Sequence, residues 1–167
     1  TTINWATTSN YKQGIDKDIV DMVAAMEAGT VGSVLLAGVN PVYDYFEGKR
    51  FGAALAKVGV TVSFNDRMDE TAQKCKFVVP DHNFLENWGD AEPRTNYFSL
   101  QQPGIAPLFK TRALQDSLMV WAGGTQTYAD FWKDYWMKKL GSQSAFDQAL
   151  QDGVIEPKEL VIGGATY

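Results

Sequence analysis

An apolar run followed by a polar, glycine-containing loop decides the fold class, because residues 33–41 read SVLLAGVNP. The branched and apolar side chains at 33–37 predict a buried strand, and the Gly-x-Asn-Pro sequence after it predicts a turn. Two more short apolar runs, VTVSF at 60–64 and FVV at 77–79, predict a second and a third strand. Buried strands with little alternation of polar and apolar residues are typical of a parallel sheet.

Helical patterns separate the predicted strands. Apolar residues recur at helical spacing between Asp16, a candidate N-cap, and Gly29. A second helix is predicted over 48–58, and a short one over 69–74 with Asp69 as its cap. This alternation predicts an α/β fold, a Rossmann-like parallel sheet with helices on both faces.

The second half of the sequence has a different character. Residues 90–109 contain three prolines and a glycine and predict an irregular excursion. Helices near 110–121, 127–140 and 144–151 predict a helical part over 110–151. Aromatic residues on one face of the middle helix indicate either core packing or a docking face for another domain or subunit. These residues are Tyr128, Phe131, Trp132, Tyr135 and Trp136.

Length and composition suit one domain. The 167 residues are 45% hydrophobic and 21% charged, which predicts a single α/β domain over 1–167 with its Rossmann-like part at 30–89. The sequence has no initiating methionine and no targeting signal, so we expect a fragment of a longer chain. No apolar run reaches the roughly 18 residues of a membrane helix, so we expect no direct membrane span.

Charge and metal-binding residue types exclude several functions. Twenty acidic residues against fifteen basic ones give a net charge of −5, and no basic cluster is present for nucleic acid. The single cysteine, Cys75, and the single histidine, His82, exclude a disulfide framework and an iron–sulfur cluster held by this chain alone. We expect Cys75 to be an inert thiol. No partner for proton transfer is evident beside His82, so we predict no catalytic residue and no metal ligand.

The ends of the predicted strands are the places where a ligand would bind. In open α/β sheets, ligands bind outside the carboxyl ends of the strands. The segments 38–41, 65–67 and 80–82 follow the three strands and supply Asn, Asp, Arg and His side chains for a nucleotide-like ligand. Each also has a structural interpretation, since Asn-Pro starts turns and Asp69 can cap a helix.

Ordered motifs here resemble those of the molybdopterin oxidoreductases of the dimethyl-sulfoxide-reductase type. The Gly-x-Asn-Pro loop at 38–41 is followed by DETA at 69–72, CKFVVP at 75–80 and FLENWG at 84–89. In that family these motifs are Thr-Glu-Thr-Ala, Ala-Asp-Val-Val-Leu-Pro and Phe-Leu-Glu-x-x-Gly. The resemblance implies a domain that helps to hold one of two molybdopterin guanine dinucleotides. The cofactor-binding positions that it implies are Gly38, Asn40, Pro41, Asn65 and Thr71.

Departures from the family pattern indicate a degenerate cofactor site. Asn65 stands where the family usually has Asp, and an amide has one acceptor oxygen and no charge. Lys76 replaces the family's Asp before the third strand. His82 stands in a segment where the family usually has small residues. We place all three at the cofactor edge and expect no cofactor in the fragment. The alternative is an active molybdopterin guanine dinucleotide-binding domain of a molybdenum oxidoreductase.

Further stretches resemble the large iron–sulfur subunit of alternative complex III, a quinol:electron-acceptor oxidoreductase. They are YDY at 43–45, WGDAEP at 88–93, SLQQP at 99–103 and DGV at 152–154. The resemblance implies electron transport, with other domains of a parent chain and the subunits of a membrane complex as partners. It also implies a location on the periplasmic side of the cytoplasmic membrane.

Overall fold

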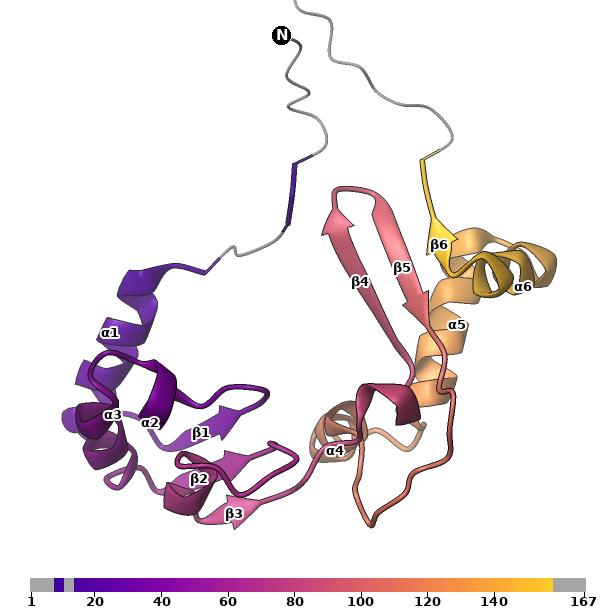
Figure 1. Ribbon diagram of the computed structural model, residues 1–167. Helices are drawn as coiled ribbons and strands as arrows, with labels where there is room; N and C mark the ends of the chain where they lie inside the picture. The colour runs from indigo at the N-terminus through magenta and orange to yellow at the C-terminus, as the bar shows by residue number, and fades with distance from the viewer. Residues whose placement is uncertain (1–7, 11–13, 158–167) are drawn as a thin grey trace, which may run out of the picture. The chain divides into compact units, whose positions relative to one another are not determined.

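The predicted parallel sheet is present in the computed structural model, which describes residues 8–10 and 14–157. The strands β1 (Ser33–Leu36), β2 (Val60–Ser63) and β3 (Phe77–Val78) are parallel, in the order β1-β2-β3. The α/β class is therefore confirmed, and the three strands end at one edge of the sheet (Figure 1).

The described residues form two compact units, each with its own sheet. The first unit contains residues 14–83 and 107–122, with the parallel sheet, and the second contains the described residues 8–10, 84–106 and 123–157. The single-domain assignment made from the sequence stays a prediction.

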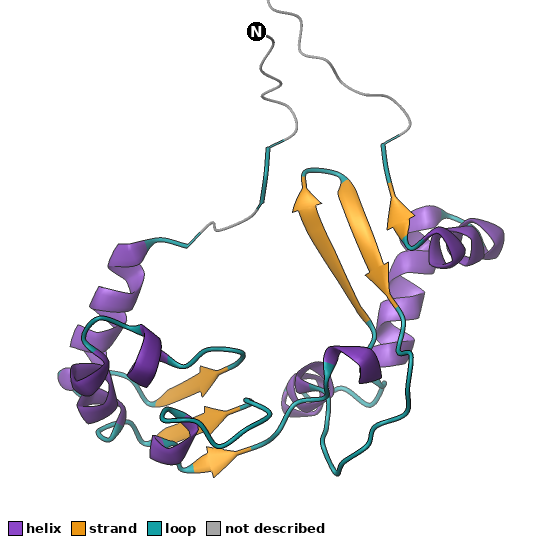
Figure 2. Ribbon diagram, viewed as in Figure 1, coloured by secondary structure: helices purple, strands orange, loops and turns teal. Residues whose placement is uncertain are grey.

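Two helices cover one face of the parallel sheet, as Figure 2 shows by element type. α1 (Asp16–Glu27) and α3 (Gly48–Leu55) enclose a core that includes Met26, Phe51 and Leu36. Fully burying one such side chain contributes about 1.5–3 kcal/mol. The predicted N-cap assignment of Asp16 is wrong. Asp16 lies in the first turn instead, where a negative charge interacts favourably with the helix dipole.

The other sheet face has one aromatic contact with a helix of the same unit. Phe64, just after β2, packs against Trp121 of α4 (Leu114–Trp121), with ring centroids 5.8 Å apart. The structure begins α4 four residues later than the sequence predicted, since the Leu114 N–H donates to the Asp81 carboxylate at 2.8 Å. Leu35 and Phe77 lie half exposed in the two outer strands.

A second, antiparallel sheet corrects the prediction of an irregular excursion over 90–109. β4 (Gly89–Arg94) pairs with β5 (Tyr97–Gln101), and β6 (Val154–Ile155) pairs with the other side of β5. Within the predicted excursion, described residues 102–109 form no helix or strand.

Local chemistry explains this hairpin. Asn96 adopts a positive φ of 64°, which asparagine tolerates in a tight turn. Its N–H donates to the Glu92 carboxylate at 2.7 Å. Pro93 indicated a loop in the sequence, but proline is compatible with an edge strand because it only removes a donor there.

Two capped helices complete the second unit. α5 (Tyr128–Leu140) begins after Thr127, whose hydroxyl accepts the Asp130 N–H. α6 (Gln143–Asp152) begins after Ser142, whose hydroxyl accepts the Ala145 N–H. A left-handed glycine follows each helix, with φ of 83° and 70°, a conformation in which a side chain would be strained.

The aromatic stripe of α5 forms the core of this unit. Trp132 and Trp136 are 2% and 1% exposed, and their indole N–H groups donate to one Asp90 oxygen at 2.7 and 2.8 Å. Phe131 and Tyr135 on the same helix remain about half exposed. The core interpretation is therefore confirmed for the two tryptophans.

Candidate functional site

The first two loops at the carboxyl edge of the parallel sheet are joined by Asn65. Its Oδ1 accepts the Gly38 N–H at 3.0 Å, and its Nδ2 donates to the Val39 carbonyl at 2.9 Å. The same Nδ2 donates to Asp69 Oδ2 at 2.6 Å. Gly38 has a φ of 63°, so the loop can turn here without the strain of a side chain. Asn65 itself is buried, with 8% of its surface exposed.

Asn40 makes a second set of bonds between the same loops. Its Oδ1 accepts both the N–H and the hydroxyl of Thr71, at 3.2 and 2.6 Å. Its Nδ2 donates to Glu70 Oε2 at 2.8 Å, and the Thr71 hydroxyl oxygen accepts the Val42 N–H at 3.0 Å. We call the set formed by Asn40, Asn65, Asp69, Glu70 and Thr71 the loop latch.

Backbone geometry supports the loop latch at two further positions. Pro41 is the first residue of α2 (Pro41–Asp44), where its missing N–H leaves no intrahelical bond unmade. Gly48 begins α3, and a Cβ there would lie 2.1 Å from the Val42 carbonyl oxygen. Only glycine fits this close approach of α2 and α3.

The third loop contacts the segment that leads into α4. Asp81 Oδ1 accepts the N–H groups of His82 and Leu114, both at 2.8 Å. His82 Nδ1 lies 2.7 Å from the Thr111 hydroxyl oxygen, and the Arg112 N–H donates to the Pro80 carbonyl at 3.2 Å. These contacts give the polar side chains of the third loop a structural role.

The expected place of Lys76 at the cofactor edge is wrong. Its Nζ donates to the carbonyls of Val58 and Gly59, at 3.0 and 2.6 Å, just before β2 begins. Lys76 itself precedes β3, and parallel strands begin at the edge opposite to the one where they end. Beside it, burial raises the pKa of the Cys75 thiol, which supports the expectation of an inert cysteine.

Charge at the carboxyl edge is mostly negative. Asp44, Asp66 and Glu70 are exposed there, with Arg67 as an exposed cation. The hydrogen bond from Asn40 holds the pKa of the Glu70 carboxyl below its ordinary value, so this carboxylate stays ionised at neutral pH. Among the described residues, no group of three or more His, Cys, Asp or Glu is placed to hold a metal ion.

The structure brings together the residues that the sequence singled out. Gly38, Asn40, Asn65 and Thr71 meet within one hydrogen-bond network, and Pro41 starts the helix beside it. Their assignment as cofactor-binding residues stays a prediction. Asp69 was not among the site residues predicted from the sequence. Its predicted role as a helix cap is the sequence feature that could have indicated its place in this network. Asp69 Oδ1 accepts the N–H groups of Thr71 and Ala72, at 3.0 and 2.7 Å.

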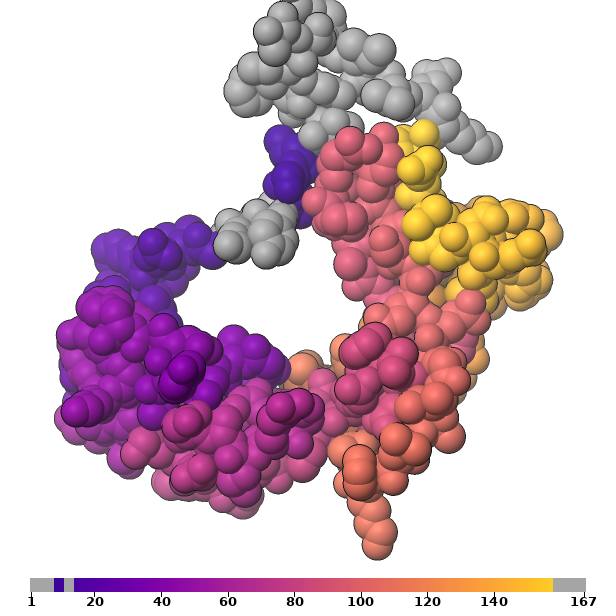
Figure 3. Space-filling model, viewed as in Figure 1, coloured from indigo at the N-terminus to yellow at the C-terminus, as the bar shows by residue number. Residues whose placement is uncertain are grey.

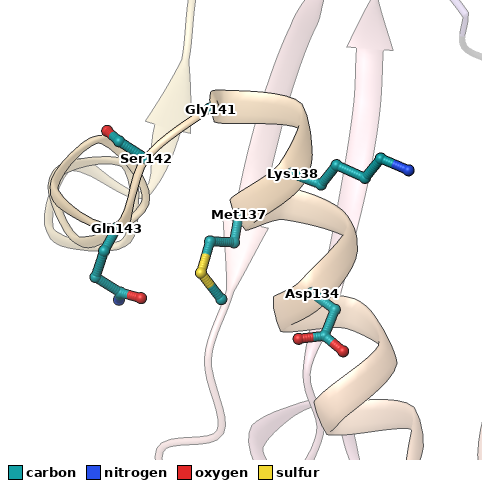
Figure 4. A pocket seen from close by; sticks show the side chains of 6 residues that line it. All are labelled: Asp134, Met137, Lys138, Gly141, Ser142 and Gln143. Atoms are coloured by element: carbon teal, nitrogen blue, oxygen red, sulfur yellow. The ribbon is translucent and has the colours of Figure 1, made fainter.

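A shallow pocket lies elsewhere, at the turn between α5 and α6 (Figure 4). Gln143 donates to Asp147, and the Ser142 hydroxyl caps α6. Lys138 extends away from Ser142 and Gln143 (Figure 4). The polar side chains that line this pocket do not converge on a common point (Figure 4).

The parallel sheet and its Gly-x-Asn-Pro loop are the features expected from the sequence's resemblance to the molybdopterin-oxidoreductase-like proteins. The chain is 30% identical over 149 residues to the menaquinone reductase, molybdopterin-binding-like subunit of Nitratidesulfovibrio vulgaris. This match covers 84% of the chain and 21% of the relative, so the chain spans about a fifth of that protein's length. It confirms the resemblance predicted from the motifs.

A solved structure has a similar fold. Acetylene hydratase from Pelobacter acetylenicus matches with a TM-score of 0.55 and 18% sequence identity. The match covers 62% of this chain and 15% of that chain, and it concerns the fold alone. No family profile matches the chain. Across the residues that the structure describes, no helix combines the length and the apolar character needed to span a bilayer.

Proposed function

We propose that the chain is a structural module of a multi-subunit electron-transfer complex, built on the molybdopterin-oxidoreductase fold with a degenerate cofactor edge. The loop latch is the observation that supports this proposal. Both polar atoms of the Asn40 side chain and both of the Asn65 side chain already have partners within the two loops. A bound dinucleotide would have to replace these bonds.

Electrostatics supports the same conclusion. A guanine dinucleotide carries a diphosphate, which proteins hold with cations and free N–H groups. The carboxyl edge presents Asp66 and Glu70 instead, with Arg67 lying 3.4 Å from Asp66. The residues at this edge therefore do not fit the dinucleotide, and the fold serves the assembly rather than the chemistry.

Metal and pterin analysis of the full-length protein tests the proposal. We expect neither molybdenum nor tungsten, and no releasable pterin, in stoichiometric amount with the protein. One equivalent of metal together with pterin would overturn the structural interpretation.

The relative's name supports a role in quinone-linked electron transport. We extend the proposal to a complex like alternative complex III, on the periplasmic side of the cytoplasmic membrane. Protease added to spheroplasts with an intact membrane should digest the protein while a cytoplasmic marker survives. Survival of the protein under the same conditions would contradict the periplasmic location.

The second candidate is a domain that holds the dinucleotide. Gly38, Asn40 and Thr71 favour it, because they match the family motif and meet at the carboxyl edge of the sheet. In that case pterin would be present, and the Asn40→Ala variant would release it. The structural module predicts that Asn40→Ala lowers stability in a protein that holds no pterin.

A further inference from the structure

Four aromatic side chains of the second unit form a continuous row. The ring centroids of Trp88 and Trp132 are 5.1 Å apart, and those of Trp132 and Trp136 are 6.3 Å apart. Tyr135 continues the row, with its ring centroid 5.5 Å from that of Trp136. Indole and phenol rings are among the side chains most readily oxidised by one electron, and rings in contact can pass an electron between them. The row is therefore a path for single electrons.

Both ends of the row reach the surface of this unit. Tyr135 is 48% exposed and Trp88 is half-buried, whereas the two tryptophans between them are buried. Phe98 of β5 and Phe146 of α6 pack against this buried pair. Figure 3 shows the hairpin of β4 and β5 in salmon beside the yellow stretch that contains α6. An oxidant at the surface can thus take an electron from the buried rings through either end.

The carboxylate of Asp90 gives this row a proton acceptor. Its Oδ2 accepts the indole N–H of Trp132 at 2.7 Å and that of Trp136 at 2.8 Å. A negative charge at this distance stabilises the cation that an indole becomes when it loses an electron. The same oxygen can take the N–H proton, which an oxidised indole releases far more readily than a neutral one. Asp90 is itself exposed, so this proton can exchange with water.

Two lysines make the neighbouring rings harder to oxidise. Lys133 Nζ lies 4.7 Å from the centroid of the Trp88 ring, and Lys139 Nζ lies 4.7 Å from that of Trp136. Lys139 also donates to the phenol oxygen at the end of the row, at 3.4 Å. A nearby ammonium opposes the loss of an electron and attracts anions to the surface. Across the described residues no lysine or arginine lies over the Trp132 ring, so this ring is the easiest of the row to oxidise.

We propose that Trp132 and Asp90 form a one-electron oxidation site that intercepts diffusible anionic oxidants, such as the carbonate radical anion. The radical accepts one electron from Trp132 through the row and becomes carbonate, with no bond formed or broken in it. The indole N–H proton passes to Asp90 Oδ2, which leaves a neutral indolyl radical beside a protonated carboxyl group. A reductant of the ascorbate or thiol class then returns one electron, and the proton goes back to the indole nitrogen. This inference goes beyond the proposed function, because it assigns redox chemistry to the second unit.

Pulse radiolysis of the full-length protein in bicarbonate solution tests the site, because it generates the carbonate radical. Transient absorption distinguishes the neutral indolyl radical from its cation. Trp132→Phe should lose most of the long-lived neutral-radical signal of the wild type. Trp121→Phe, which removes an exposed tryptophan of the first unit, is the matched control and should keep that signal. An undiminished long-lived signal in Trp132→Phe would overturn the proposal.

Asp90→Asn separates proton transfer from packing. The amide oxygen can still accept an indole N–H, but it cannot hold the proton. A positioned proton acceptor accelerates a step by about 10²–10⁴-fold, so the neutral radical should form at least about tenfold more slowly in this variant. The radical cation should then be visible before the neutral radical. If Asp90 has only a structural role, the neutral radical will form at the wild-type rate, and that result would overturn the proposal.

Lys133→Met gives a measurement that leaves the buried core intact. Without this ammonium the Trp88 ring becomes easier to oxidise, so the radical should be shared between Trp88 and Trp132. Because Trp88 is closer to solvent, ascorbate should reduce the radical at least about twofold faster than in the wild type. An unchanged rate would overturn the assignment of the radical to Trp132. Urea denaturation of all the variants will show that each is folded under the conditions of the radical measurements.

Discussion

Asn65→Asp gives the most direct test of the loop latch, because it introduces the residue usual in the molybdopterin oxidoreductases. The amide Nδ2 donates to the Val39 carbonyl at 2.9 Å and to Asp69 Oδ2 at 2.6 Å, and an ionised carboxylate can donate neither bond. Losing one neutral hydrogen bond costs about 1 kcal/mol, and losing one to a charged group costs about 1.5–3 kcal/mol. We therefore expect a destabilisation of about 3–4 kcal/mol at pH 7, with repulsion from Asp69 included.

The loss should depend on pH with a defined sign. Two carboxyl groups in contact raise the pKa of one of them above its value in the unfolded chain. The variant is then least stable, relative to the wild type, when both carboxyls are ionised. Its deficit should shrink as the pH falls from 7 through the raised pKa. Urea denaturation followed by far-UV circular dichroism at pH 7 and pH 5 measures this difference.

A compensating substitution sharpens the test. Asn65→Asp combined with Asp69→Asn restores an amide–carboxylate pair with the roles exchanged. The new amide oxygen can still accept the N–H groups of Thr71 and Ala72. The double variant should recover more than half of the lost stability. Wild-type stability of Asn65→Asp at pH 7, or additive losses in the double variant, would refute this account.

Three other substitutions test separate contacts. Asp90→Ala removes the acceptor of two indole N–H groups and should lower the free energy of unfolding by about 2–4 kcal/mol in urea denaturation; a loss under about 0.5 kcal/mol would contradict the bonds. The bond from Asn40 lowers the Glu70 pKa, so its stabilisation is present above the unfolded pKa and lost as the pH falls through the folded one. In the Glu70→Gln variant, the melting temperature should therefore fall less steeply below about pH 5 than in the wild type. An equal slope would contradict this contribution of Glu70. The buried Tyr45 hydroxyl has no hydrogen-bond partner among the described residues. Tyr45→Phe should therefore raise the free energy of unfolding by about 1 kcal/mol. A decrease would show that the hydroxyl does have a hydrogen-bond partner.

Local sequence patterns predicted most of the secondary structure. The runs at 33–37 and 60–64 became β1 and β2, and the helical spacing after Asp16 became α1. The hairpin of β4 and β5 was missed, because Pro93 and Asn96 are turn residues in most contexts. Whether a strand lies at the edge or in the middle of a sheet depends on the strands it pairs with. Local composition does not predict this position.

The candidate site was predicted as a set of positions and not as a set of bonds. Parallel topology follows from strand–helix alternation, so the loops at 38–41 and 65–67 could be expected at one edge. The same topology puts Lys76 before the third strand, at the edge where the strands begin. The expectation that it lies at the cofactor edge was therefore wrong. Its side chain binds carbonyls at the opposite ends of the strands.

The sequence by itself determined the α/β class, the parallel strands and the likeness to molybdopterin-oxidoreductase-like proteins, because these follow from periodicity and ordered motifs. Only the tertiary structure decided that Asn40 pairs with Thr71 and Asn65 with Asp69, and that two tryptophans share Asp90. Hydrogen bonds require donor and acceptor within about 3 Å in a fixed direction. Most of these partners are separated by dozens of residues along the chain, so their pairing exists only once the loops and helices are packed together.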